Sequence, residues 1–155
     1  MKKFTLLIFL AFVSCAPMMD VKIQSVQEVV ETKSSKNDLF VKANQWMVKT
    51  FNNAESVIQF SDKESGTITG KYMLKQTYSV GSNYQYVPNG GIFAVINIDI
   101  KDNKARITIT PENYRTPSQH NDPALIYKEE TARADINNLI QEFSESIKQE
   151  SDKDW

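Results

Sequence analysis

Residues 92–109, which read IFAVINIDIKDNKARITI, decide the fold of this chain. Isoleucine or alanine occupies every second position on either side of the polar segment 101–104, which is the pattern of two half-buried strands joined by a tight turn. Asp102 and Asn103 tolerate the left-handed backbone conformation that such turns require. The stretch therefore predicts a β-hairpin with one apolar face and one polar face.

The turn also fixes the register of this hairpin. Closing it between its two lysines places Ile98 opposite Ile107 on the apolar face. On the polar face the same pairing places Asp99 opposite Arg106, where opposite charges form a modest cross-strand ion pair. The hairpin thus predicts a buried face and a solvent face for the whole sheet.

A second alternating stretch covers residues 58–74, with a turn at residues 62–66. Closing this turn between Ser61 and Thr67 places Phe60 on the apolar side of the sheet, and the glycine in the turn supplies the positive φ that such loops require. The sequence therefore predicts a second hairpin ahead of the isoleucine-rich one.

Two segments repeat apolar residues at helical spacing. Residues 37–52 follow a run of capping side chains, and residues 132–147 carry an apolar stripe with charged residues on the other side. Residues 21–30 suggest a first strand, whereas residues 76–91 form either a third turn with strand extensions or a loop. We expect an α+β fold, β-α-β-β-β-β-α, with an antiparallel sheet of about five strands and two helices packed on one face.

The N-terminal segment is typical of a secretory signal. Two lysines precede a largely apolar run of ten residues, whose helical rise of about 15 Å is half of the roughly 30 Å hydrocarbon core, too short for a lasting membrane span. Ordinary cleavage after Ala16 would put a proline first in the mature chain, which fits poorly. Residues 12–15, which read FVSC, resemble instead the lipobox of bacterial lipoproteins, in which the cysteine is acylated. We therefore expect a lipid on Cys15.

The expected domain organisation follows from this cleavage. Residues 1–14 are the signal peptide, residues 15–20 a lipidated tether, residues 21–148 a single α+β domain, and residues 149–155 a frayed tail. Ala16 follows the cysteine directly, and Asp20 is the only charged residue close behind it. Both favour the outer membrane, facing the periplasm. The chain is thus expected in the bacterial cell envelope, in contact with the membrane through its lipid.

Composition excludes several classes of function. Cys15 is the only cysteine, so acylation leaves no thiol for a disulfide, a metal or catalysis. The 18 basic and 19 acidic residues give a formal net charge of −1, and no basic run resembles a nucleic-acid patch. The sequence also lacks a phosphate-binding glycine loop and a two-histidine metal spacing. We expect no cofactor, no metal and no nucleic-acid partner.

Residues 62–70, which read DKESGTITG, resemble the hairpin of a family of bacterial envelope proteins. That family is classed as a domain of unknown function with a fold like that of TATA-box-binding protein. The helix at 37–52 and the isoleucine-rich hairpin lie where the family has them, so the resemblance covers about residues 21–147. It implies this fold and a lipoprotein context, brings no catalytic residues and no known activity, and lends no reason to expect DNA binding.

The face of the sheet opposite the helices and the tyrosine-bearing segment are the candidate partner-binding surface, unless a loop or tail of the chain covers them. The residues concerned are Met73, Tyr78, Tyr84, Tyr86, Phe93, Val95, Asp99 and Arg106. Aromatic and Met side chains in a polar setting favour contact with a protein, peptide or glycan. The sequence therefore predicts a non-catalytic envelope binding module.

The alternative is a small envelope hydrolase or transferase. It would use Asp99, Arg106 or His120, the only histidine, in a pocket that the sequence does not reveal. His120 lies among polar and proline residues, where a solvated loop position is the simpler interpretation. The ion pair between Asp99 and Arg106 likewise has a structural explanation, so we do not expect an enzyme.

Overall fold

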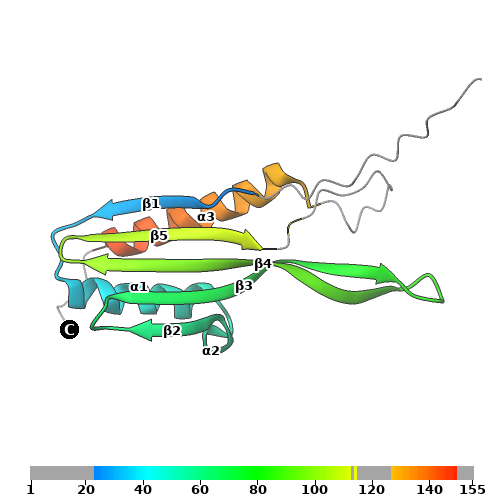
Figure 1. The fold of residues 1–155 in the computed structure, drawn as a ribbon, viewed down its shortest axis with the longest axis horizontal. Coiled ribbons are helices and arrows are strands. Elements are labelled where there is room, and N and C mark those ends of the chain that lie inside the picture. The colour runs from blue at the N-terminus through cyan, green and yellow to red at the C-terminus, as the bar shows by residue number, and fades with distance from the viewer. Residues whose placement is uncertain (1–22, 113, 115–126, 150–155) are drawn as a thin grey trace, which may run out of the picture.

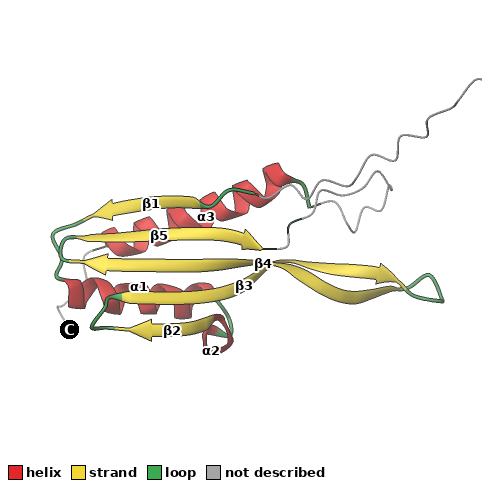
Figure 2. Cartoon of the chain, in the orientation of Figure 1, coloured by secondary structure: helices red, strands yellow, loops and turns green. Residues whose placement is uncertain are grey.

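The structure, a computed structural model, describes residues 23–112, 114 and 127–149. The strands are β1 (Val26–Glu31), β2 (Ile58–Asp62), β3 (Thr67–Val80), β4 (Tyr86–Lys101) and β5 (Lys104–Glu112), and the helices are α1 (Lys36–Thr50), α2 (Ala54–Val57) and α3 (Glu129–Lys148). The strands form one antiparallel sheet in the order β1-β5-β4-β3-β2. Both long helices lie on the same side of it (Figures 1 and 2). The predicted α+β fold is confirmed, and the short α2 was not predicted.

The core lies between the sheet and the two long helices. It is built from Val30, Leu39, Ala43, Trp46, Met47, Ile68, Tyr72, Ala94, Ile96, Ile98, Ile100, Ala105, Ile107, Ile109, Ile136, Ile140, Phe143 and Ile147. Trp46 of α1 meets Phe143 of α3 edge to face, with ring centroids 5.1 Å apart. Alternate residues of β4 from Ala94 to Ile100, and of β5 from Ala105 to Ile109, are therefore buried under the helices, which is the physical meaning of the isoleucine alternation.

Helix α1 begins where its capping side chain predicts. The Ser35 hydroxyl accepts a hydrogen bond from the Asp38 N–H at 3.2 Å and donates one to the Asp38 carboxylate at 2.9 Å. These contacts satisfy one of the free N–H groups of the first turn. At the other end the N–H of Phe51 donates to the carbonyl of Met47, and the helix stops two residues before the predicted end.

The β4–β5 hairpin has the predicted register throughout. Ile98 pairs with Ile107, and Asp99 pairs with Arg106. The turn residue Asn103 has a φ of +65°, the left-handed conformation expected of it. This agreement follows because a slip of one residue would turn every isoleucine out of the core.

The predicted register of the β2–β3 hairpin is wrong at Phe60. Asp62 pairs with Thr67, one position further into the turn than predicted, and Phe60 pairs with Thr69. An extra residue, Gln59, is accommodated at a bulge, which reverses the sides of the residues beyond it. Phe60 is accordingly 51% exposed and lies on the face of the sheet opposite the helices.

The segment between the two hairpins forms strand extensions and a turn, which is the first of the two predicted alternatives. Strands β3 and β4 continue far beyond their neighbours and project from one end of the sheet (Figure 1). Register shifts near Lys75 and Thr77 interrupt their pairing. Such bulges increase the local twist of a strand pair and change its direction.

Several predicted features lie outside the described residues. These are the signal peptide at 1–14, Cys15 with its tether, His120, and the C-terminal tail beyond Gln149. The described chain begins at the buried Ile23, and β1 starts at Val26, later than the predicted strand.

Candidate partner-binding surface

The face of the sheet opposite the helices, here called the open face, carries side chains from all five strands. It comprises Val29, Phe60, Thr67, Thr69, Lys71, Met73, Phe93, Val95, Asn97, Asp99, Arg106 and Thr108. Among the described residues, no helix lies on this side of the sheet (Figure 2). The predicted residues Met73, Phe93, Val95, Asp99 and Arg106 are therefore brought together on one surface.

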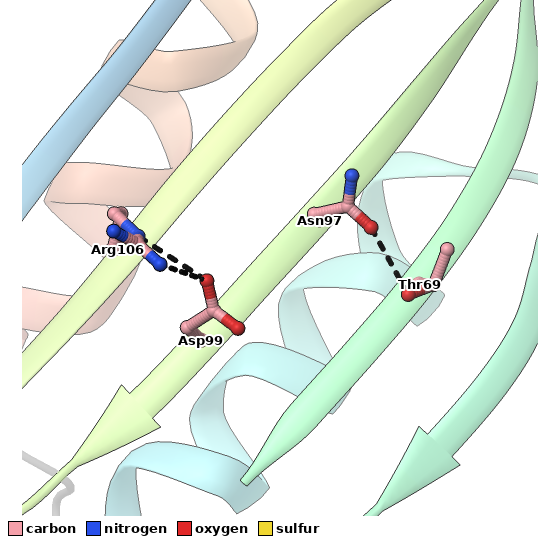
Figure 3. A network of polar contacts seen from close by, with 4 residues as sticks. All are labelled: Thr69, Asn97, Asp99 and Arg106. Carbon is pink, nitrogen blue, oxygen red and sulfur yellow. Dashed lines mark hydrogen bonds and ion pairs between the residues drawn. The ribbon is translucent and has the colours of Figure 1, made fainter.

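Two polar pairs cross the centre of the open face (Figure 3). Arg106 donates from Nε and Nη2 to Oδ2 of Asp99, at 3.2 and 2.7 Å. Beside them the Thr69 hydroxyl donates to Oδ1 of Asn97 at 3.1 Å. The side chains of the ion pair are 51% and 40% exposed, so water screens their attraction and the pair contributes at most about 1 kcal/mol to stability.

Lys71 joins the polar and apolar parts of the open face. Its Nζ atom lies 2.6 Å from a carboxylate oxygen of Glu112 and 5.3 Å from the centroid of the Phe93 ring. The ammonium group is thus held over an aromatic face, an arrangement that is favourable electrostatically. Phe93 is half-buried as a result, and the charge of Lys71 is paired within the chain.

Three apolar side chains of the open face stay exposed. Val29 and Phe60 are each 51% exposed, and Met73 is 44% exposed. Val29 and Phe60 were not among the predicted surface residues. For Val29 the sequence held a signal, since Val29 and Val30 are adjacent in a predicted strand and adjacent strand residues face opposite sides. The structure buries Val30 and exposes Val29. For Phe60 the bulge concealed the signal.

A small cavity opens at the β1 side of the ion pair. Its volume is about 180 Å³, and it is lined by Val29, Asp99, Lys101, Lys104, Ala105 and Arg106. Pockets that bury small-molecule ligands usually measure about 300–1,000 Å³. The cavity is therefore suited to one or a few small groups of a larger partner rather than to a whole ligand.

The projecting hairpin, here called the arm, consists of residues 75–92. The pairing of β2 with β3 reaches no further toward the arm than Gly70, and the pairing of β5 with β4 reaches no further than Phe93. The arm therefore has only two strands. Its side chains are largely in solvent: Val80 is 54%, Tyr84 90%, Tyr86 55% and Val87 48% exposed, whereas Tyr78 is half-buried opposite Pro88. The predicted tyrosines therefore lie apart from the open face, along the arm and at its tip.

Side chains of the arm satisfy the backbone at its bulges. The Gln76 amide donates to the carbonyl of Gly90, and the Thr77 hydroxyl donates to the carbonyl of Asn89. At the tip the N–H of Gly81 donates to the carbonyl of Gln85 at 2.8 Å, and Tyr84 has a φ of +57°. Tyr84 is 90% exposed in this turn, so its ring is displayed to solvent.

A second buried cluster lies at the root of the arm. Ile23, Tyr114, Tyr127 and Ala132 form it, with Leu74 and Ile92 packed against it. The Tyr114 hydroxyl donates to the Tyr127 carbonyl at 2.8 Å. The Tyr127 hydroxyl donates to Asp135 at 2.7 Å.

Ionisation is suppressed for Tyr127 and also for Tyr72 of the main core. Burial, followed by the hydrogen bond to Asp135, raises the pKa of Tyr127 far above its ordinary value. Burial and the charge of Asp135 raise the pKa of Tyr72 in the same direction. Both hydroxyls therefore stay protonated at neutral pH.

Two further properties concern only the part of the chain that the structure describes. Within it, no three or more His, Cys, Asp or Glu side chains are grouped so that they would hold a metal ion. None of its helices has the length and apolar character needed to cross a membrane.

The chain was compared with known proteins. The sequence model of the family described as "Domain of unknown function (DUF4468) with TBP-like fold" matches residues 27–115. No curated protein matches the chain significantly.

Two crystal structures share its fold. One is a TBP-like protein from Parabacteroides distasonis, 18% identical, with a TM-score of 0.53 over 86% of this chain and 97% of that one. The other is a DUF4468 family protein from Bacteroides ovatus, 13% identical, with a TM-score of 0.55 over 90% and 95%. The resemblance inferred from residues 62–70 is confirmed: this chain belongs to the DUF4468 family of domains with a TBP-like fold.

Proposed function

We propose that this protein is a non-catalytic module of the bacterial envelope, anchored by a lipid on Cys15, that binds a protein partner through the open face. The observation that carries the proposal is the exposure of Val29, Phe60 and Met73 on a sheet face that no described helix covers. Val29 lies on the edge strand β1, Phe60 on the opposite edge strand β2 and Met73 on β3, so these apolar side chains are spread across the face among polar ones. Such a mixture of apolar and polar surface is typical of protein interfaces.

The size of the open face suits a protein partner. Five strands about 4.8 Å apart give a width near 24 Å, and the nine residues of β5 extend about 30 Å. Because β1 and β2 have only six and five residues, the face covers roughly 600 Å², which approaches the ~800 Å² that each partner contributes to a standard interface. A small ligand would use only a fraction of this surface.

The chemistry of the open face supports the same class of partner. Phe, Met and Arg are enriched in protein interfaces relative to other surfaces, and the open face has all three. The charges at its centre and beside Phe93 are paired within the chain, Asp99 with Arg106 and Lys71 with Glu112. A partner therefore gains apolar contact without having to neutralise an isolated charge, since unpaired charges are costly to bury.

Photocrosslinking in living cells tests the proposal. A photoreactive residue replaces Met73, Phe60 or, as a control, Val48 of α1, which is 59% exposed on the helical side. We expect one protein adduct of the same mass at Met73 and Phe60, because both side chains lie in the proposed interface.

The control separates a specific interface from random encounters. Val48 has exposure similar to Phe60 but lies on α1, across the sheet from the open face. The proposal predicts no shared adduct at Val48. Identical adduct patterns at all three positions, or background labelling at Met73 and Phe60, would contradict it.

A further inference from the structure

We propose that the arm is a second membrane contact, whose tyrosine-bearing tip rests in the headgroup region of the bilayer that holds the Cys15 lipid. The inference rests on the lipid anchor of the proposed function. It assigns the arm a partner, a lipid surface, that differs from the protein partner of the open face.

The arm is chemically suited to a membrane interface. Residues 76–92 contain no charged side chain, although 24% of the chain is charged and 17 residues would hold about four charges on average. Its exposed large apolar and aromatic side chains are Val80, Tyr84, Tyr86 and Val87. Tyrosine is enriched where a membrane meets water, because its ring is apolar and its hydroxyl hydrogen-bonds to headgroups and water.

The arm leaves the sheet at the end where the described chain begins. Ile23 lies in the cluster against which Leu74 and Ile92 pack, and these two residues form the root of the arm. Figure 1 shows the arm projecting from the end of the sheet at which β1 starts. The described chain therefore begins at the same end of the domain as the arm.

The segment from Cys15 to Ile23 can span a distance similar to the length of the arm. From Cys15 to Ile23 are eight residue steps, which reach at most about 28 Å. The six arm residues of β3, Lys75 to Val80, extend about 20 Å from the sheet. A lipid at Cys15 and the tip of the arm can thus lie on the same bilayer while the sheet stands clear of it.

The depth of the contact is limited by the backbone of the arm. A two-stranded ribbon has unpaired N–H and C=O groups along both edges, and these groups cannot enter the hydrocarbon region without partners. The headgroup region offers water and polar groups to satisfy them. An isolated hairpin is only marginally stable in water, so contact with a surface would also stabilise the arm.

Quenching by brominated lipids tests the inference. The protein carrying Tyr84→Trp, purified from bacterial envelopes after natural processing, is reconstituted into phosphatidylethanolamine and phosphatidylglycerol vesicles, with or without bromine on the acyl chains. We expect the added fluorescence to shift to the blue and to be quenched by roughly half, because an interfacial indole lies near the acyl chains. Tyr86→Trp, at a second exposed position, should behave in the same way.

Val48→Trp is the matched control, since Val48 is 59% exposed on α1. Its added fluorescence should stay unquenched, and the parent protein supplies the background of its own two tryptophans. Protein that floats with the vesicles but shows no quenching at either arm position overturns the inference and leaves the anchor intact. Shielding of the arm indoles only after envelope glycan or protein is added also overturns it. Protein that does not float with the vesicles overturns both the anchor and this inference.

Discussion

The Cys15→Ala chain is expected to lose all incorporation of labelled palmitate. The cysteine thiol is the only group in the chain that a lipobox enzyme would acylate, and no second cysteine replaces it. At ~0.8 kcal/mol per buried CH₂, one long acyl chain contributes on the order of 10 kcal/mol to membrane binding, and two or more make the anchor effectively permanent. Labelling of cells with palmitate, followed by capture of the protein, measures the loss.

Ser14→Ala is the matched control for this change. It alters the neighbouring position but keeps a small side chain there, so the processing signal stays intact. The Ser14→Ala chain should label like the parent. Palmitate labelling of Cys15→Ala at the level of a labelled parent would show that the lipid is carried elsewhere. A parent chain that takes up no palmitate would show that the signal is an ordinary one.

The Phe143→Ala chain is expected to lose about 3–5 kcal/mol of unfolding free energy. Phe143 is fully buried in α3 and meets Trp46 edge to face. Its removal leaves a cavity between the two helices and the sheet that the surrounding side chains fill only in part. Since domains are stable by about 5–15 kcal/mol, the loss is a large share of the total. Urea unfolding followed by circular dichroism measures it.

Phe60→Ala tests the same residue type on the opposite face. Phe60 is 51% exposed, so truncation removes little buried area and should cost less than about 1 kcal/mol. The difference between the two variants reports which face of the sheet the helices cover. Equal losses at Phe60 and Phe143 would contradict the placement of the open face.

The isoleucine pattern allowed the fold to be predicted because burial leaves β4 and β5 one register. The pairing of Ile98 with Ile107 follows from the turn at 101–104 alone, and the structure has it. The two long helices could also be predicted from the sequence, since Ser35 caps α1 and an apolar stripe runs along α3. Local chemistry and the global fold agree in these elements.

The hairpin of β2 and β3 was predicted, but its register at Phe60 was not, because a bulge has no required sequence. Gln59 is polar and fits an unpaired position at the bulge, yet it fits an ordinary strand position equally well. Phe60 therefore seemed suited to the core from its alternation, and only the tertiary pairing with Thr69 shows that it faces solvent. An apolar residue on an open surface breaks the pattern that sequence reasoning uses.

The candidate surface was predicted in parts. The alternation placed Met73, Asp99 and Arg106 on one polar face, and the structure has them there. The arm was harder to predict. The residues around Tyr84 are uncharged and mostly polar, and they show no apolar alternation that would mark a strand packed on the core. Its length depends on how far two strands pair without a third, which side-chain patterning does not encode.

The most direct test of the open face is the oxidation rate of Met73 in intact envelopes. A Val48→Met chain is treated with peroxide, and the oxidation rate is measured separately at buried Met47, at half-exposed Met73 on the open face and at the introduced methionine on α1. In purified protein we expect Met73 and the introduced methionine to oxidise readily and Met47 slowly. In envelopes we expect Met73 alone to slow, several-fold relative to the introduced methionine, because the partner covers it. The same ratio of the two rates in both preparations would contradict a protein-binding role for the open face.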